Sequence, residues 1–183
     1  NSGRYKFDAW LDKLKNAAAI NIDSLENLEE ALLKRMDHFA ACGCVASDLG
    51  IPNFVNEECT KEQAAEIFNQ RLKGETLSKQ QTLEWQTYML RFLSIENAKR
   101  GWTQFFHQGP MRDENSSIFE SQGPDVGGDG PGALIDRAAF IAFLDYLQSF
   151  AVPDSIDGTG LAKTVIFPIN YGDYEFVLDT IAG

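Results

Sequence analysis

Three short apolar segments, separated by long helical patterns, constrain the fold of this chain more than any other feature. The segments are Cys44–Ser47, Trp102–His107 and Thr164–Ile169. Strands that alternate with helices pair in parallel through right-handed crossover connections. We therefore expect an α/β protein in which residues 1–183 form a single domain with about three parallel strands.

Helical patterns occupy most of the remaining sequence, where apolar residues recur at steps of three and four. Capping boxes at Thr60-x-x-Gln63 and Ser78-x-x-Gln81 open two of these helices. The expected helical ranges are 7–18, 23–43, 60–74, 79–100, 134–150 and the residues from 174 onward. The part from about 53 to 100 is expected to be a helical insertion.

Polar residues stand at or near the carboxyl ends of the three expected strands. His107 ends the second strand, while Asp48 and Asn170 each follow a strand within a residue. Ligands of α/β enzymes bind beyond the carboxyl ends of parallel strands. We expect the three residues to converge on one rim, with Asp48 and His107 within reach of a hydrogen bond or one water. Taken alone, His107 has a second reading, as a residue that only caps a buried strand.

A long glycine-rich loop extends from Gln108 to Gly132 and has the composition of an active-site loop. Arg112 lies in it, and its planar guanidinium suits a carboxylate clamp; a surface arginine is the alternative. The segment from residue 123 to 132 lacks the Lys and Ser/Thr of a P-loop. It carries Asp125 and Asp129, which would repel phosphate, so a nucleotide site is rejected.

Composition excludes several other classes of protein. The net charge of -11 argues against a nucleic-acid surface, and no apolar stretch has the length of a bilayer span. Three cysteines are too few for a disulfide framework, so we expect reduced thiols in a cytoplasmic protein. His38 and His107 stand on different elements, and no metal-binding residue is assigned. His38, near a helix end, is expected to be structural.

The ends of the chain also carry an expectation. The sequence begins at Asn1 without an initiator methionine and ends at Gly183 inside an expected helix, so both ends are interpreted as cuts. A sheet with unpaired strand edges tends to associate with other chains. We therefore expect an open α/β fragment that self-associates into a homo-oligomer and, alone, binds no tightly held metal.

With these residues in view, the sequence resembles uronate isomerase, also called glucuronate isomerase, of the amidohydrolase superfamily. The similarity runs over nearly the whole chain. It is densest in residues 34–48, 71–78 and 100–115, with shorter matches at 123–127 and 163–166. The resemblance implies that this chain is the middle part of a (β/α)8 TIM-type barrel with additional helical insertions.

The resemblance also implies an activity, in which D-glucuronate is converted to D-fructuronate and D-galacturonate to D-tagaturonate. It implies a divalent metal such as zinc in the complete enzyme, held by a His-x-His motif outside this sequence. By the same resemblance, His107 and Asp48 match the family's strand-end histidine and its Ser-Asp carboxylate. Arg112 and Asn115 match the arginine and last asparagine of its His-x-Gly-x-x-Arg-Asn-Asn-Asn loop and are expected to bind the uronate sugar.

Several positions depart from the family pattern, including Gly128, Gly130-Pro131 and the segment from Asn170 to Asp173. Leu49 replaces the histidine that follows Ser-Asp, and Asp113 and Glu114 replace two asparagines of the loop. These departures keep two alternatives open. One is a non-catalytic fragment that retains only the fold. The other is a divergent member of the superfamily that cleaves an amide or ester.

Overall fold

The computed structural model describes residues 2–124 and 126–182, without the side chains of residues 2–6. Over that part of the chain, the backbone divides into two compact units. The helical unit comprises Asn1–Val45 and Glu57–Phe92, and the α/β unit comprises Ala46–Asn56 and Leu93–Gly183. The expected insertion at 53–100 contributes to the helical unit, which also takes in the first 45 residues. Asn1 and Gly183, the two ends of the chain, lie outside the described residues.

The helical unit is built from α1 (Ser2–Ala18), α2 (Leu25–Ala41), α3 (Lys61–Leu72) and the first part of α4 (Lys79–Lys99). Thr60 and Gln63 form both halves of the predicted capping box at the start of α3. The apolar faces of these helices pack into one core. Its buried members are Leu11, Leu14, Ala18, Ile22, Leu25, Leu28, Ala31, Ala64 and Phe68.

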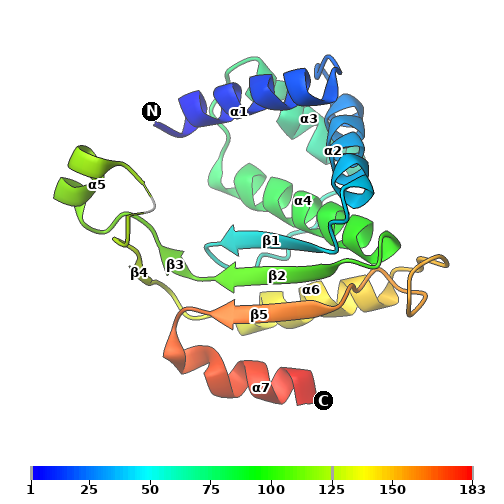
Figure 1. The fold of residues 1–183 in the computed structure, drawn as a ribbon, viewed down its shortest axis with the longest axis vertical. Helices are drawn as coiled ribbons and strands as arrows, with labels where there is room; N and C mark the ends of the chain where they lie inside the picture. The colour runs from blue at the N-terminus through cyan, green and yellow to red at the C-terminus, as the bar shows by residue number, and fades with distance from the viewer. Residues whose placement is uncertain (1, 125, 183) are drawn as a thin grey trace. The chain divides into compact units, whose positions relative to one another are not determined.

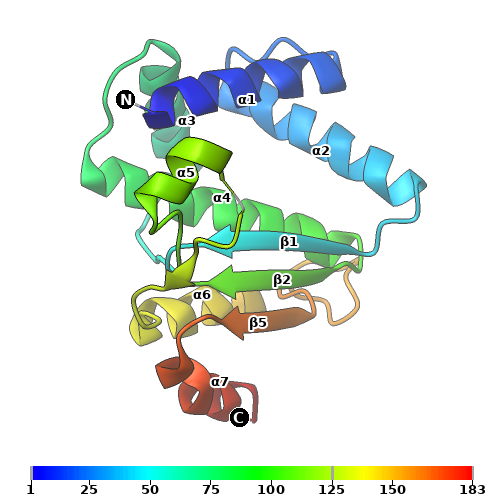
Figure 2. The ribbon, with the colours of Figure 1, turned by 60° about the vertical axis from the view of Figure 1, so that its left-hand side comes forward.

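The α/β unit is centred on a parallel sheet. Among the described residues, β1 (Ala46–Ile51), β2 (Thr103–Gln108) and β5 (Thr164–Pro168) form this sheet in the order β1-β2-β5. Figures 1 and 2 show the three strands running side by side in the same direction. Helix α6 (Arg137–Ser149) covers one face of the sheet, and α7 (Tyr174–Ala182) follows β5 through the short helix η1 (Tyr171–Asp173).

Alternation along β2 gives the sheet two different faces. Gln104, Phe106 and Gln108 are buried, and Phe106 packs against Phe143 of α6 with ring centroids 6.0 Å apart. The intervening residues, which include His107, are half-buried on the opposite side. We call that opposite side the open face; the strand register places Asp48, Gly50, Phe105, His107 and Phe167 on it.

The first strand differs from its predicted position. The expected segment was Cys44–Ser47, whereas β1 runs from Ala46 to Ile51 and pairs with β2 along its whole length. Asp48 therefore lies inside the strand, not just beyond its end. The Asp-Leu-Gly sequence has the composition of a turn, but the ladder with β2 stabilises an extended backbone through Gly50.

The loop from Gln108 to Gly132 also contains more structure than its composition predicts. Pro110–Met111 (β3) and Gly130–Pro131 (β4) pair as a short antiparallel ladder, and α5 (Ser116–Gln122) lies between them. The following helix, α6, begins at Arg137 with Asp136 as its N-cap, a turn later than the expected start at Leu134. Within the described part of the chain, no helix combines the length and apolar character needed to cross a bilayer.

Candidate active site

His107 and Asp48 meet on the open face of the sheet. The imidazole Nδ1 of His107 lies 2.8 Å from Oδ1 of Asp48, across the β1–β2 ladder. This distance confirms that the two side chains are within hydrogen-bond reach. An imidazole that donates from Nδ1 to a carboxylate presents Nε2 as its acceptor, so the pair can exchange a proton with a ligand at Nε2.

The ring of His107 also stacks on Phe167 of β5, its register partner. The two ring centroids are 4.8 Å apart and the planes differ by 15°. Phe167 stacks in turn near Phe105, with centroids 6.0 Å apart. The imidazole therefore has both its plane and its Nδ1 edge fixed by neighbours on adjacent strands.

Arg112 brings a positive charge to the same face. Its Nη2 lies 3.0 Å from the position that a Cβ would take at Gly50, and Gly50 is the register partner of His107. The guanidinium therefore lies over the bare backbone of β1, the strand that also carries Asp48. Its Nη1 forms an ion pair with Oδ2 of Asp129 at 2.6 Å.

Asp129 also contacts the turn that follows Arg112. Its Oδ1 accepts a hydrogen bond of 3.1 Å from the backbone N–H of Asp113, which has a φ of +56°. The N–H of Glu114 donates to the carbonyl of Gly128 at 2.9 Å. These contacts join the turn after β3 to the segment before β4, so Arg112 projects from a braced turn and not from a loose loop.

The side chains of two further predicted site residues form hydrogen bonds with the backbone. Asn115 is the N-cap of α5, where its Oδ1 accepts from the N–H of Ile118 at 3.2 Å. Asn170 accepts from the N–H of Gly172 through Oδ1 and donates to the carbonyl of Gly132 through Nδ2. The expected convergence of three polar residues thus holds for Asp48 and His107, while the amide of Asn170 braces the loops.

Metal-ligating groups are sparse in the described part of the chain. No cluster of three or more His, Cys, Asp or Glu side chains there is arranged to hold a metal ion. His38 lies in the last turn of α2, with Nε2 4.0 Å from the Sγ of Cys42, and belongs to the helical unit. All three cysteines of the chain are free thiols.

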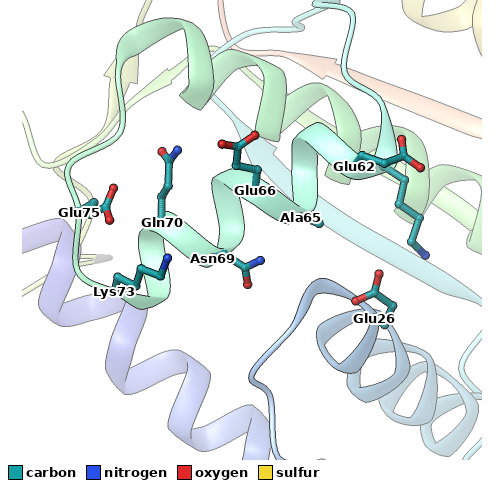
Figure 3. Close-up of a pocket in the computed structure, with 9 residues that line it drawn as sticks. Glu26, Glu62, Ala65, Glu66, Asn69, Gln70, Lys73 and Glu75 are labelled. Carbon is teal, nitrogen blue, oxygen red and sulfur yellow. The ribbon is translucent and has the colours of Figure 1, made fainter.

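Two hollows differ in character. One of about 680 Å³ opens beside His107 and is otherwise walled by β5, the following turn and α7. The other, of about 610 Å³, lies in the helical unit and is shown in Figure 3. Four glutamates and two lysines line it. Backbone N–H groups lower the pKa of Glu26 and of Glu62, so both carboxylates stay charged and disfavour an anionic ligand there.

Comparison with known proteins identifies the family. The family model described as glucuronate isomerase matches residues 3–183. The chain belongs to the glucuronate isomerase family. Uronate isomerase of Bacteroides fragilis is 35% identical over 164 residues, which cover 90% of this chain and 33% of that protein. Uronate isomerase of Salmonella heidelberg is 37% identical over 178 residues, or 97% of this chain and 36% of that protein.

Solved structures show the fold of this glucuronate isomerase family member. Uronate isomerase of Thermotoga maritima superposes with a TM-score of 0.82 at 23% identity, covering 95% of this chain and 36% of that one. Glucuronate isomerase of Caulobacter crescentus superposes with a TM-score of 0.73 at 20% identity, covering 89% of this chain and 32% of that one. The parallel strands and helices are thus part of a (β/α)8 barrel with additional helices. The chain spans about a third of the length of these relatives.

Three contributors to the site of this family member were missed by sequence reasoning. Phe167 and Gly50 are visible once the strand register is known, because each pairs with His107. Asp129 stands 17 residues after Arg112 in the glycine-rich loop, and the sequence analysis treated it only as an obstacle to phosphate. The companion residue in that argument, Asp125, lies outside the described residues.

Proposed function

We propose that the open face of the α/β unit is part of the active site of a uronate isomerase. The protein that contains this sequence would interconvert D-glucuronate with D-fructuronate and D-galacturonate with D-tagaturonate. The observation that carries the proposal is the 2.8 Å contact between His107 and Asp48 with the guanidinium of Arg112 on the same face. Family membership over residues 3–183 supports the same conclusion.

Each of these groups meets a need of aldose–ketose isomerisation. The reaction moves hydrogen between C1 and C2 of the open-chain sugar, which requires an acid/base near C2 and donors at the sugar oxygens. His107 supplies the acid/base through Nε2, and Asp48 orients its ring. Arg112 binds the C6 carboxylate, a geometry for which a planar guanidinium is suited. Asn115 contacts the sugar from the start of α5.

The leucine at position 49, in place of the family's histidine, is compatible with this activity. Leu49 follows Asp48 in β1 and pairs with Phe106, so it points to the α6 side of the sheet and away from the open face. The replacement of the family's histidine by leucine therefore removes no group from the face that carries His107. This favours a catalytic site over a non-catalytic scaffold.

A divalent metal such as zinc belongs to the proposal for the complete enzyme only. Among the described residues, no group of three or more His, Cys, Asp or Glu side chains could hold it. The proposed partner is a small uronate sugar, with no role for nucleic acid or membrane. We further propose a cytoplasmic location, which the free thiols support, and self-association into a homo-oligomer.

The proposal is tested by assaying the intact protein with D-glucuronate and D-galacturonate. His107→Asn is expected to lower turnover by about 10²-fold or more, the usual scale for losing a general acid/base. His38→Asn is the matched control, because that histidine lies in the helical unit, and it should leave turnover unchanged. Near-normal kinetics for His107→Asn would return that residue to a structural role.

The 183-residue chain by itself is expected to form no fructuronate. It contributes three strands of the parallel sheet among its described residues, whereas a closed barrel needs eight and typically about 250 residues. Measurable conversion by the isolated chain would show that three of the eight strands are sufficient for the chemistry.

A further inference from the structure

Asp129 contacts the side chain of Arg112 through one carboxylate oxygen and the backbone beside that arginine through the other. Oδ2 pairs with Nη1 of Arg112 at 2.6 Å, and Oδ1 accepts from the N–H of Asp113 at 3.1 Å. One carboxylate thus fixes both the charged end of the Arg112 side chain and the backbone from which that side chain starts.

The turn needs such a brace. Asp113 has a φ of +56°, in the left-handed region that residues with a side chain seldom adopt. A hydrogen bond from its N–H to Asp129 stabilises this conformation. The direction in which Arg112 leaves the turn therefore depends on Asp129.

The position of Nη2, the other end of the guanidinium, depends on the absence of a side chain at residue 50. Nη2 of Arg112 lies 3.0 Å from where a Cβ of residue 50 would stand, which is closer than ordinary contact. Gly50 leaves room for the guanidinium directly beside His107, its partner in the ladder. Asp129 on one side and Gly50 beneath together set the position of the charge.

We propose that Asp129 is a positioning residue that holds Arg112 over Gly50 in the orientation that binds the carboxylate of the uronate. This inference rests on the proposed function. Asp129 acts through Arg112 and does not itself touch the sugar. The pair with Asp129 engages Nη1 of the guanidinium. The Arg112 side chain is 52% exposed, so a ligand can reach it while Asp129 stays in place.

A competing role for Asp129 predicts the opposite kinetics. A carboxylate that merely occupied the guanidinium would have to leave before a uronate could bind, and its removal would tighten binding. The second oxygen of Asp129 instead accepts a hydrogen bond from the backbone of the turn, so we expect Asp129 to stay in contact with Arg112 when the substrate binds. Neutralising Asp129 should therefore weaken the binding of the uronate.

The test compares KM and kcat for D-glucuronate in the intact protein. Asp129→Asn keeps the size of the side chain but removes the charge, and we expect KM to rise by roughly ten-fold, as when an orienting partner is lost. The effect on kcat should be smaller. Glu120→Gln, which removes an exposed carboxylate from α5, is the matched control and should change neither constant.

The same pair of constants in an Arg112→Ala background shows whether Asp129 acts through the arginine. The substitution Asp129→Asn should then have little further effect on KM. An unchanged or lowered KM for the single variant, or additive effects in the double variant, would overturn the inference while the proposed function stands. A parent protein that converts no uronate would instead overturn the proposed function. Thermal unfolding midpoints identify any variant that fails to fold. In that case KM and kcat are measured in Asp129→Glu, which retains the charge.

Discussion

His107 is held from two directions by side chains on neighbouring strands. Asp48 fixes the Nδ1 edge of the ring at 2.8 Å, and Phe167 lies against its plane at 4.8 Å. A carboxylate at Nδ1 selects the tautomer of the imidazole, while an aromatic ring limits its rotation. The two contacts together present Nε2 in a constant direction on the open face.

Asp48→Asn tests the first of these contacts. An asparagine can offer an N–H to Nδ1 in place of an acceptor, so we expect a mixture of imidazole tautomers and a fall in turnover of about 10- to 100-fold. Nitrogen NMR of labelled His107 measures the tautomer directly. Ser47→Ala is a suitable control, because Ser47 accepts from Asn97, which is buried. A single Nδ1–H tautomer in the Asp48 variant would contradict the prediction.

At this scale the sequence predicts some residues and not others. Asp48 and His107 are predictable as a pair, because the sequence places each near the carboxyl end of an expected strand and parallel strands share that edge, although Asp48 lies inside β1 in the structure. The position of Arg112 depends on the left-handed turn at Asp113 and on the contact with Asp129. Such contacts between segments 17 residues apart have no periodic signal, so they appear only in the folded chain.

The elements inside the glycine-rich loop depend on glycine for close approach. A Cβ at Gly132 would lie 2.8 Å from the carbonyl oxygen of Gly109, and one at Gly130 would lie 2.2 Å from the carboxylate of Glu114. The short β3–β4 ladder needs this room. Composition alone shows a flexible loop here, because a ladder of two pairs is too short to produce an alternating pattern.

The helix α5 offers a prediction about Asn115. Its Oδ1 caps the helix, so Asn115→Ala should release the first turn of α5, at a cost of about 0.5–2 kcal/mol in local stability. Asn115→Asp keeps the capping oxygen and should preserve the helix. Hydrogen exchange of the amides of residues 116–122 measures the difference; equal protection in the two variants would rule out a capping role.

The same pair of variants separates capping from sugar binding. Asparagine donates through Nδ2, which aspartate lacks. If Asn115 also contacts the sugar, Asn115→Asp will retain α5 and still raise KM for D-glucuronate. A normal KM in that variant would confine Asn115 to its structural role.

At the scale of the whole molecule, the α/β unit exposes large apolar side chains around β5 and α7. Phe167, Tyr171, Leu178 and Ile181 are between 42% and 79% exposed. Contiguous apolar surface of this kind marks an association site in soluble proteins. The net charge of -11 opposes association at long range, but salt screens that repulsion.

We therefore predict that the chain self-associates in a concentration-dependent way, and more readily at high salt. Leu178→Glu combined with Ile181→Glu should shift it towards the monomer, since both side chains are more than 60% exposed. Sedimentation velocity at several concentrations gives the measurement. Val126→Glu, an exposed apolar position in the glycine-rich loop, serves as control. A monomer at all concentrations would contradict the prediction.

The pH dependence of stability should originate in the helical unit. Burial, and then a hydrogen bond to Glu29, raises the pKa of Tyr88, and a hydrogen bond to the same carboxylate raises the pKa of Lys61. Both groups hold their protons more firmly in the folded chain than in the unfolded chain. Their contribution to stability is therefore complete below about pH 10 and is lost as the pH rises further.

Tyr88→Phe should flatten this alkaline loss. The unfolding midpoint, followed by circular dichroism between about pH 8 and pH 11, is expected to fall less steeply in the variant than in the parent chain. Tyr171→Phe, at a 79% exposed position, provides the comparison. An identical slope for all three proteins would show that the half-buried phenol of Tyr88 does not govern alkaline unfolding.

Glycine at position 50 limits which substitutions leave the site unchanged. Any other residue would bring a Cβ against the guanidinium of Arg112, whose flexible end would give way by a few tenths of an ångström. A missense change to alanine would thus spare the fold and the acid–base pair while displacing the cation. Such an allele would yield abundant, folded protein and, under the proposed function, would reveal its defect only in cells that depend on scarce uronate for growth.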